Sequence, residues 1–385
     1  MSGYVFVSNS SKPNEEKLND RTPIHIGNVG RPCLKSALDR GYDVYYGVNR
    51  ANPEELACDM PVNLFESHTY RSISAIKDNF IAYKNLCKVI DSGKVDVVHC
   101  NTPIGGMVGR FAGKRKKVKK VIYTAHGFHF YKGAPLFNRT ILKWAEKLMA
   151  HWTDAIITMN KEDFEAAQKF KLRNKGKVYF VHGVGVNLSD YADIGEFRDE
   201  KRAELGLAEN DIAMISMGDL VPRKNYSVAI EAIAKADNPN LQYFICGKGP
   251  ELENLKKLAQ DLNVSKQVHF LGFRKDIKEL ISAVDVFLFT TKQEGLPRSM
   301  MEAMAGGLPC IASKIRGNTD LVEDGVNGFL CNPVSSDEFA EAIVKLISDK
   351  DLMNKMRNAN LEKIKQYDVS VVAEEIEAIY KEVLG

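Results

Sequence analysis

Acidic and basic side chains cluster around a predicted strand–loop–helix unit in the C-terminal half of the chain. The run Asp285–Thr290 is short, apolar and rich in β-forming residues, which predicts a buried parallel strand. The next loop carries Glu294, a helix is predicted from Ser299 to about Ala305, and a second strand is expected over 309–312. The exposed amides at the start of such a helix form an anion site.

Two carboxylates accompany this predicted anion site. Glu294 precedes the helix, and Glu302 is expected within its first turn. Phosphate-binding amides beside acids that accept hydrogen bonds from hydroxyl groups suit a nucleotide that carries a sugar. The spacing Ser299-x-x-Glu302 also fits a capping box, in which the carboxylate would only stabilise the start of the helix. The spacing alone supports both interpretations.

A second charged loop follows the predicted strand Ile212–Met217. It begins at Gly218 and carries Arg223 and Lys224 immediately before a predicted helix. Two fixed cations between a strand end and a helix suit a pyrophosphate group. No Asp-x-Asp motif stands at a strand end where a divalent metal would be expected. We therefore predict no metal site and expect the two cations to take the role of a metal.

Strands and helices alternate through the N-terminal half, which predicts a parallel sheet whose ligands gather at the carboxyl ends of the strands. His126 and Asn101 both lie at such ends. A lone histidine in this position is either structural or part of a site. Phe128, Phe130 and Tyr131 are either core residues or an apolar lip for a substrate. Gly30, before a predicted helix, either serves a tight turn or contributes to a ligand site.

Length and composition indicate a two-domain globular protein. The 385 residues exceed the usual size of one hydrophobic core, and a glycine-containing hinge at 183–186 predicts domains at 1–186 and 187–367. An apolar fraction of 44% and a charged fraction of 27% are typical of soluble proteins. Neither a membrane span nor a signal peptide is expected. Seven cysteines without metal-type or redox-type spacing indicate reduced thiols in a cytoplasmic protein.

The small net charge conceals an asymmetry between the two halves. Residues 1–190 contain 29 Lys/Arg against 18 Asp/Glu, whereas the remainder contains 24 against 32. Six cations are concentrated in the seven residues Lys114–Lys120. Such a run is either a solvated surface segment or a contact for an anionic membrane surface. No nucleic-acid partner is expected.

Five short motifs together resemble those of family 4 glycosyltransferases. They are Gly247–Pro250, Gly272–Ile277, Glu294–Pro297, Glu302–Ala305 and Asp324–Gly328. Glu294 and Glu302 match the Glu-x7-Glu signature of that family, and the resemblance covers nearly the whole chain. It implies an α/β fold of the GT-B type, with two Rossmann-like domains whose parallel sheets face a cleft. It also implies a C-terminal helix, at about 368–385, that packs back on the first domain.

The resemblance further implies roles for individual residues. Glu294 would hold hydroxyls of the transferred sugar, Glu302 would hold the ribose, and Lys224 would neutralise the departing diphosphate. His126 would lie near the anomeric carbon and the acceptor. The other residues expected at the donor site are Gly30, Arg223, Gly249, Arg274, Leu296, Pro297, Arg298 and Ser299. Asp219 stands where the family often has arginine, and Arg223 is the candidate to supply that charge.

These observations predict a retaining, metal-independent hexosyl- or N-acetylhexosaminyl-transferase with no separate cofactor. Residues 122–130 resemble enzymes of bacterial capsule and exopolysaccharide assembly, which implies a nucleotide-sugar donor, UDP-linked, and an undecaprenyl diphosphate-linked saccharide acceptor. The enzyme would then work at the inner face of the plasma membrane. Two alternatives remain open: a nucleotide-sugar 2-epimerase on the same scaffold, and a catalytically silent subunit that binds a sugar nucleotide.

Overall fold

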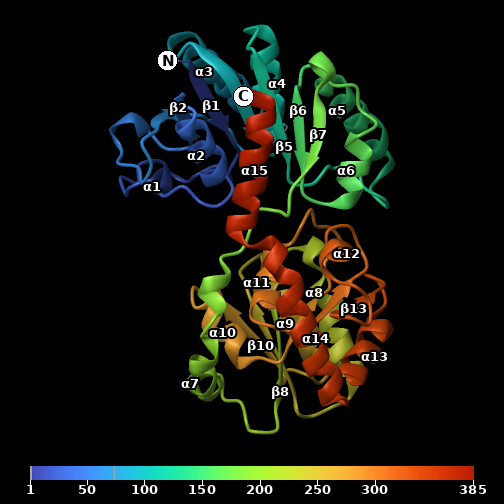
Figure 1. The fold of residues 1–385 in the computed structure, drawn as a ribbon. Helices are drawn as coiled ribbons and strands as arrows, with labels where there is room; N and C mark the ends of the chain where they lie inside the picture. The colour runs from blue at the N-terminus through green and yellow to red at the C-terminus, as the bar shows by residue number, and fades with distance from the viewer. Residues whose placement is uncertain (1, 73) are drawn as a thin grey trace. The chain divides into compact units, whose positions relative to one another are not determined.

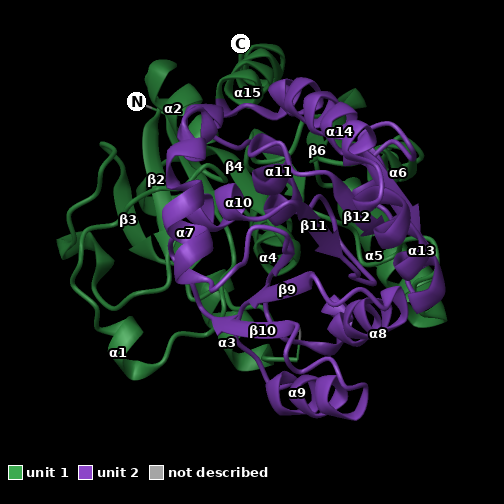
Figure 2. Cartoon of the chain, turned by 90° about the horizontal axis from the view of Figure 1, so that it is seen from below, with its two compact units in different colours: residues 1–184, 370–385 green, residues 185–369 purple. Residues whose placement is uncertain are grey.

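The chain folds into two compact units, and the computed structural model describes every residue except Met1 and Ile73 (Figure 1). Unit 1 extends to Val184 and is completed by Ser370–Gly385, whereas unit 2 is Gly185–Val369 (Figure 2). The sequence predicted domains at 1–186 and 187–367. Each of the two predicted boundaries lies two residues from the boundary between the units in the structure.

Unit 1 is organised around a seven-stranded parallel sheet with the order β3-β2-β1-β4-β5-β6-β7. The strands are β1 (Gly3–Val7), β2 (Asp43–Val48), β3 (Asn63–Glu66), β4 (Val95–Asn101), β5 (Lys120–Ala125), β6 (Ala155–Thr158) and β7 (Lys177–Phe180). The strand order reverses between β1 and β4. In open parallel sheets, ligands bind beyond the carboxyl ends of the strands at such a reversal.

The helices of unit 1 follow its strands in the alternation that the sequence predicts. They are α1 (Glu15–Leu18), α2 (Arg31–Asp39), α3 (Ile76–Ser92), α4 (Pro103–Arg115), α5 (Lys143–Ala150), α6 (Lys161–Ala167) and α15 (Val369–Leu384). Short helical turns are η1 (Pro53–Glu55), η2 (Asn138–Leu142) and η3 (Arg173–Lys175). The turn η2 leads directly into α5, so the two form one continuous helical segment.

Helix α4 lies unusually close to the sheet because its inner face is built of glycine. A Cβ at Gly106 would collide with the ring of Tyr123, and one at Gly109 would collide with the side chain of Cys100. The flanking strands β4 and β5 are buried along almost their whole length. This close packing fixes the first turn of α4 against the carboxyl ends of β1 and β4.

The last helix, α15, returns to unit 1, as Figure 2 shows by colour. Glu377 binds Arg40, the residue directly after α2, at 2.8 Å and accepts a hydrogen bond from Ser36. Tyr380 is fully buried, and its hydroxyl lies 2.6 Å from both Tyr4 Oη and His99 Nδ1. A charged anchor at the surface and a buried polar cluster therefore attach α15 to the sheet.

Unit 2 contains a six-stranded parallel sheet with the order β10-β9-β8-β11-β12-β13. The strands are β8 (Ile212–Met217), β9 (Leu241–Cys246), β10 (Val268–Gly272), β11 (Val286–Phe289), β12 (Cys310–Ser313) and β13 (Gly328–Cys331). The helices are α7 (Arg198–Glu204), α8 (Tyr226–Ala236), α9 (Leu252–Asp261), α10 (Ile277–Ala283), α11 (Arg298–Ala305), α12 (Asn318–Leu321), α13 (Ser336–Ile347) and α14 (Lys350–Lys363). Short turns are η4 (Leu188–Tyr191), η5 (Ile194–Phe197), η6 (Pro222–Lys224) and η7 (Ile364–Tyr367).

The order of this second sheet reverses between β8 and β11, which are neighbours in the sheet. Both strands are apolar and almost entirely buried, as expected for central strands covered by helices on both faces. The charged loops predicted from the sequence follow these two strands. Among the described residues, no helix is both long and apolar enough to cross a membrane. All seven cysteines are free thiols, and six of them are buried.

Candidate active site

The charged loops of unit 2 meet beyond the carboxyl ends of β8 and β11. Lys224 ends the turn η6 after β8, and Glu294 lies in the loop after β11. Lys224 Nζ lies 2.7 Å from Glu294 Oε1, and Arg223 Nη1 lies 3.3 Å from the same oxygen. The side chains of Lys224 and Glu294 are 11% and 14% exposed, whereas that of Arg223 is 49% exposed. Three residues predicted from two separate loops thus share one polar cluster.

Neighbouring groups hold the Glu294 loop in place. Thr291 Oγ1 donates to Glu294 Oε1 over 3.0 Å, and Arg316 Nε donates to the Glu294 backbone carbonyl over 3.1 Å. A Cβ at Gly317 would collide with the carbonyl oxygen of Gly295, so the two loops touch through their backbones. Arg316 is 7% exposed. Sequence analysis missed it, although an arginine four residues after the predicted strand 309–312, and beside Gly317, was a usable signal.

Helix α11 begins at Arg298, two residues earlier than a helix capped by Ser299 would, and its start corrects the capping-box interpretation. The residue before it is Pro297, which makes no side-chain capping bond, and Ser299 lies inside the helix. Glu302 lies beyond the first turn and pairs with Arg298 Nε at 2.9 Å. Its carboxylate is therefore not a cap. The first amides of α11 have no partner within the helix, which leaves them available to an anion beside Leu296 and Pro297.

Burial raises the pKa of the Glu302 carboxyl, and the neighbouring Arg298 guanidinium partly offsets this shift. The Glu302 side chain is 19% exposed, whereas that of Arg298 is 62% exposed. A carboxylate that is largely removed from water and paired only with a solvated arginine gains from a hydrogen-bond donor brought by a ligand.

Glycines at the ends of β8 and β9 allow backbone segments to approach closely. A Cβ at Gly247 would collide with the Gly218 carbonyl oxygen, and one at Gly249 would collide with the Leu220 carbonyl oxygen. Gly249 therefore contributes backbone to this edge of the sheet. A side chain at position 249 would push the two loops apart. The close packing of the loops therefore explains why glycine stands there.

Arg274 has a structural partner for its guanidinium group. Its Nε donates to Asp276 Oδ1 over 2.7 Å, and its Nη2 lies 2.7 Å from Glu204 Oε1. Lys201 joins the same network by pairing with Asp276 at 2.9 Å. These cations hold the pKa of the Asp276 carboxyl well below its usual range, through the hydrogen bond from Arg274 and against the effect of burial. Any contribution of Arg274 to a ligand site is therefore expected from its backbone.

In unit 1, polar side chains gather where the order of the sheet reverses between β1 and β4. The Asn9 backbone amide donates to Thr102 Oγ1 over 3.0 Å. Asn9 Oδ1 and Asn101 Oδ1 are buried, and within the described part of the chain neither has a hydrogen-bond partner. Thr102 adopts a φ of 65°, which is strained for a β-branched residue. Unpaired buried oxygens beside a strained residue at the start of α4 indicate a binding surface.

His126 lies at the same edge, directly after β5. Its Nε2 atom is buried and is likewise without a partner among the described residues. Burial, reinforced by the positive charge of Arg71, lowers the pKa of the His126 imidazole to about 4. The ring is therefore neutral near pH 7, and Nε2 is available to a ligand. A lone histidine could be structural, the family resemblance favoured a functional one, and the unpaired nitrogen supports the functional interpretation.

A buried network that sequence analysis missed lies next to this edge. His99 of β4 is fully buried, with Nε2 at 2.8 Å from Thr124 Oγ1 and Nδ1 at 2.6 Å from Tyr380 Oη. Burial, with a smaller effect of His126, lowers the pKa of His99 to about 3. Only the tertiary contact with α15, which follows hundreds of residues later, shows that this histidine is fully partnered.

The structure bears on two questions that the sequence left open. Phe128 and Phe130 stack with ring centroids 4.7 Å apart and are 2% and 7% exposed, so they belong to the core and not to a substrate lip. Gly30 precedes α2 with a φ of −105°, and a Cβ there would make only ordinary contacts. Gly30 nevertheless lies in a tight turn, in which its backbone amide donates to the Gly27 carbonyl over 3.1 Å, and its predicted role at a ligand site stays a prediction.

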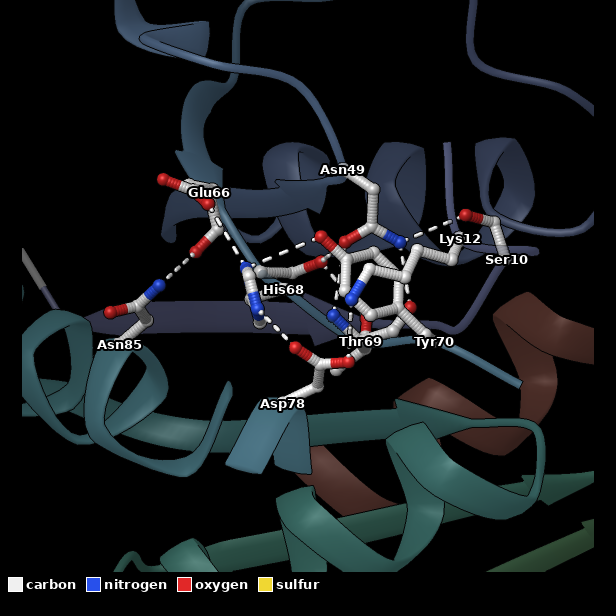
Figure 3. Close-up of polar contacts among 10 residues, drawn as sticks. Ser10, Lys12, Asn49, Glu66, His68, Thr69, Tyr70, Asp78 and Asn85 are labelled. Atoms are coloured by element: carbon white, nitrogen blue, oxygen red, sulfur yellow. Dashed lines mark hydrogen bonds and ion pairs between the residues drawn. The ribbon is translucent and has the colours of Figure 1, made fainter. Parts of the chain in front are cut away.

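Polar side chains also connect the carboxyl ends of β1, β2 and β3, as Figure 3 shows. His68 Nε2 lies 3.0 Å from Asp78 Oδ1, and Lys12 Nζ pairs with Asp78 Oδ2 at 2.9 Å. Asn49 Nδ2 donates to the Thr69 carbonyl over 2.6 Å. Hydrogen bonds from Lys12 and His68 lower the pKa of the Asp78 carboxyl. These hydrogen bonds and ion pairs therefore hold together the loops that follow β1, β2 and β3, at the edge of the sheet where a ligand is expected.

Nearby groups compensate part of the positive charge of the basic run Lys114–Lys120. Lys116 pairs with Asp91 at 2.5 Å and Lys119 pairs with Asp96 at 2.7 Å, whereas Lys114 lies over the ring of Trp152. Because the run joins the end of α4 to the start of β5, it lies at the opposite edge of the sheet from His126. The described residues contain no group of three His, Cys, Asp or Glu side chains arranged to hold a metal ion.

Comparison with known proteins decides the family. A family model described as "Glycosyl transferases group 1" matches residues 197–363, and one described as "Glycosyl transferase 4-like" matches residues 22–160. EpsD of Bacillus subtilis, which is named as a glycosyltransferase, is 36% identical over 307 residues, or 78% of this chain and 80% of EpsD. The chain is a group 1 glycosyltransferase. The family inferred from the five sequence motifs is confirmed.

Two further relatives and two solved structures extend the match. An Escherichia coli enzyme named UDP-Gal:alpha-D-GlcNAc-diphosphoundecaprenol alpha-1,3-galactosyltransferase is 32% identical to this glycosyltransferase over 80% of the chain and 81% of the relative. A Campylobacter jejuni enzyme named N,N'-diacetylbacillosaminyl-diphospho-undecaprenol alpha-1,3-N-acetylgalactosaminyltransferase is 23% identical over 92% and 94%. HepE of Anabaena, solved in complex with UDP, superposes with a TM-score of 0.75 at 20% identity, covering 99% and 100% of the two chains. Sucrose-phosphate synthase of Thermosynechococcus elongatus superposes with a TM-score of 0.80 at 18% identity, covering 99% of each. The predicted fold of two Rossmann-like domains is confirmed.

Proposed function

We propose that the enzyme transfers a sugar, with retention at the anomeric carbon, from a UDP-sugar to an undecaprenyl diphosphate-linked saccharide during assembly of a surface polysaccharide. The observation that carries this proposal is the cluster of Lys224, Arg223 and Glu294 beside the start of α11. Cleavage of the bond between sugar and diphosphate places negative charge on the leaving oxygen. Preorganised cations and helix amides stabilise that charge by about 3–4 kcal/mol per well-placed donor.

Each donor-site residue has a role that suits its surroundings. Lys224 neutralises the departing diphosphate, while the amides over 296–299 bind its oxygens at the start of α11. Glu294 accepts hydrogen bonds from hydroxyls of the transferred sugar, and Glu302 accepts them from the ribose. Gly249 and the backbone at Arg274 line the nucleoside part of the site. Because cations and amides neutralise the leaving group, we propose that the reaction is independent of a metal ion and occurs by front-face substitution.

The acceptor assignment is supported by what the relatives are named for. The Escherichia coli and Campylobacter jejuni relatives are both named for saccharides carried on diphosphoundecaprenol and for an α-1,3 linkage. In this chain we assign the acceptor to the edge of unit 1 that contains His126, Asn101 and Asn9, whose buried polar atoms lack partners among the described residues. Hydroxyl groups of a saccharide satisfy such atoms well.

We also propose that the enzyme works at the inner face of the plasma membrane, where such an acceptor is held, and that an anionic membrane surface is a partner of the Lys114–Lys120 run. Lys116 and Lys119 are occupied by Asp91 and Asp96, so the remaining cations of the run provide the attraction. Each basic residue near an anionic surface contributes about 1 kcal/mol.

The test is transfer by the purified enzyme from a panel of UDP-sugars to a short-chain polyprenyl diphosphate that carries one N-acetylhexosamine. We expect one donor to be consumed only when acceptor is present, with the anomeric configuration retained in the product and with chelator having no effect. An inverted linkage would contradict retention. Release of an epimerised sugar without acceptor would contradict transfer, and stable binding of every donor without turnover would indicate a silent subunit.

A further inference from the structure

Unit 1 exposes an unusual amount of apolar surface on one set of helices. Nine of the fifteen large apolar side chains that the described residues expose lie within 76–148, and all nine belong to α3, α4, η2–α5 or the residues just before η2. Phe80 is 55% exposed, Phe111 is 47% exposed and Trp144 is 64% exposed. Isolated exposed apolar residues need no explanation, whereas a contiguous group marks an interaction surface.

These helices enclose a groove of about 460 Å³. It is lined by Ile76, Phe80 and Tyr83 of α3, Met107 and Phe111 of α4, and Trp144 and Leu148 of α5, together with Trp152. Asn79 is the only lining residue whose side chain is neither aliphatic nor aromatic. We call this surface the apolar face. Along η2–α5, Ile141, Trp144 and Leu148 recur at helical spacing, so this segment presents an apolar stripe to solvent.

Positive charge surrounds the apolar face. The helices α3, α4 and η2–α5, all of whose residues are described, carry nine Lys/Arg and three Asp/Glu. Eight of the nine cations are exposed, and the exception is the buried Arg110. Lys84 lies over the ring of Phe80 at 4.5 Å from its centroid, and Lys114 lies over Trp152 at 4.0 Å. The ammonium groups of both lysines therefore lie over aromatic rings, as in cation–π contacts, and keep positive charge next to the apolar side chains.

All three acidic side chains of these helices are already paired. Asp78 binds Lys12 and His68 (Figure 3), Asp91 binds Lys116, and Glu146 binds Arg110 at 2.7 Å. The apolar face is therefore rimmed by cations without a competing free carboxylate on its own helices. An apolar stripe with Trp and Phe, bordered by lysine and arginine, is the pattern of a helix that lies in the interface of an anionic bilayer.

Charge also argues against a second copy of the chain as the occupant. A symmetric dimer through this surface would place the same eight exposed cations opposite one another. That repulsion is avoided on a membrane, where the cations meet lipid phosphates and the apolar side chains enter the boundary between headgroups and acyl chains.

We propose that the apolar face docks unit 1 on the surface of an anionic lipid bilayer. The side chains that enter are chiefly Phe80, Ile141, Trp144 and Leu148, and the lysines at the rim bind the phosphates. This inference rests on the proposed function only for the identity of the membrane, which is the one that holds a lipid-linked acceptor. It also gives the Lys114–Lys120 run a secondary role, at one end of the face.

The position of the apolar face within unit 1 suits such an acceptor. Helix α4 starts directly after the carboxyl end of β4, and η2 starts twelve residues after His126. Asn138 Nδ2 donates to the His129 carbonyl over 3.0 Å, so the start of η2 is attached to the loop that carries His126. One end of the apolar face therefore adjoins the edge assigned to the saccharide, and a polyprenyl chain could remain in the bilayer while its sugar reaches that edge.

The chain offers an intrinsic probe for this proposal, because its only two tryptophans, Trp144 and Trp152, both line the groove. The full-length protein is mixed with vesicles of phosphatidylglycerol and phosphatidylcholine, and with vesicles of phosphatidylcholine alone. We expect a blue shift of the tryptophan emission, and quenching by lipids brominated on the acyl chain, with the anionic vesicles.

Substitutions with a matched control complete the test. Phe80→Ser, Ile141→Ser and Leu148→Ser are combined, and the control combines Val326→Ser, Val334→Ser and Val344→Ser, which remove exposed apolar side chains from unit 2. We expect the first variant to lower vesicle partitioning at least about tenfold, because each lost apolar group removes part of the transfer free energy. The control variant should bind as the wild type does.

Two outcomes would overturn the proposal: equal partitioning of both triple variants, or vesicle binding that leaves the tryptophan emission unchanged. Concentration-dependent self-association that only the first variant abolishes would assign the face to a second copy instead. Turnover on a water-soluble acceptor analogue separates this proposal from the proposed function, since docking variants should retain it. Absence of turnover in the wild type, with vesicle binding intact, would contradict the function alone.

Discussion

At the scale of single residues, the ion pair between Lys224 and Glu294 indicates how the site responds to its donor. The Lys224 ammonium lies 2.7 Å from a carboxylate that we assign to the sugar hydroxyls. A bound diphosphate carries more negative charge than Glu294, so Lys224 is expected to shift toward it and release the carboxylate for the sugar. Arg223, which is 49% exposed, is free to follow, and it can supply charge that Asp219 cannot.

The first prediction concerns Lys224. Lys224→Ala should lower kcat by about 100-fold or more, because the leaving diphosphate loses its nearest cation. Steady-state kinetics with a saturating UDP-sugar and a soluble acceptor measures this effect. Lys292→Ala, which removes an exposed lysine from the neighbouring loop, is the matched control and should retain activity. Full activity of folded Lys224→Ala would remove Lys224 from the mechanism.

The second prediction concerns Glu302. Glu302→Gln should weaken UDP binding about 10–100-fold, because a charge-assisted hydrogen bond to the ribose is worth about 1.5–3 kcal/mol. Stability should change little, since the Arg298 partner of Glu302 is 62% exposed and glutamine keeps the size of the side chain while it removes a partly buried charge. Isothermal titration with UDP measures the affinity. The control is Glu253→Gln, which breaks a solvent-exposed helix pair with Lys256 in the same unit. Unchanged affinity in Glu302→Gln would leave the residue without a ligand role.

At the scale of helices and strands, the sequence predicted most of the elements that form the donor site. Apolar runs such as Asp285–Thr290 and Ile212–Met217 correspond to β11 and β8 within one residue at most at each end. They were predictable because central parallel strands are buried on both faces and leave few polar positions. The start of α11 was not predictable to the residue, because Ser299 is a good cap by type while Pro297 already allows the helix to begin.

The sequence did not show which side chains pair with one another in the folded protein. Arg110 is fully buried, although it looks in the sequence like one more cation of a basic half. Its guanidinium forms two hydrogen bonds with Glu146, 36 residues later, and lies over the ring of Tyr123. The apolar face escaped notice for a similar reason. Its residues look like core in the sequence, and only the arrangement of α3, α4 and α5 leaves them exposed.

The third prediction follows from this buried pair, which connects α4 to α5. Glu146→Ala should destabilise unit 1 by about 3–5 kcal/mol, because it leaves the buried Arg110 charge without a partner. Trp144 and Trp152 lie on and just after α5, so tryptophan fluorescence during urea unfolding reports on this region directly. The double substitution Arg110→Met with Glu146→Leu should recover most of the loss, because it removes both charges. Asp39→Ala, at an exposed helix pair with Lys35, should leave the transition unchanged.

At the scale of the whole molecule, the chain crosses between its two units twice, and α15 completes unit 1 after unit 2 has been built. The sequence alone suggested this return only through its resemblance to a family, because nothing in the composition of 369–384 specifies a partner. The structure supplies the physical reason: an apolar stripe ending at the fully buried Tyr380, and a charged anchor between Glu377 and Arg40. Residues 370–385 therefore supply part of both the core and the surface ion pairs of unit 1.

The final prediction tests that anchor through its pH dependence. Hydrogen bonds from Arg40 and Ser36 lower the pKa of the Glu377 carboxyl to about 2, from 4.5. Because the folded-state pKa is depressed, the stabilisation is complete above pH 4.5 and is lost as the pH falls toward 2. Glu377→Gln should therefore lower the unfolding midpoint of unit 1 at pH 7, and the difference from wild type should shrink steadily below pH 4.5. Thermal unfolding of both proteins at pH 7, 4 and 3 measures this difference, in which the titration of His99 and His126 cancels. Glu374→Gln alters an exposed neighbour on the same helix and should show no such dependence. A difference that stays constant from pH 7 to 3 would mean that Glu377 stabilises α15 by packing and not through its charge.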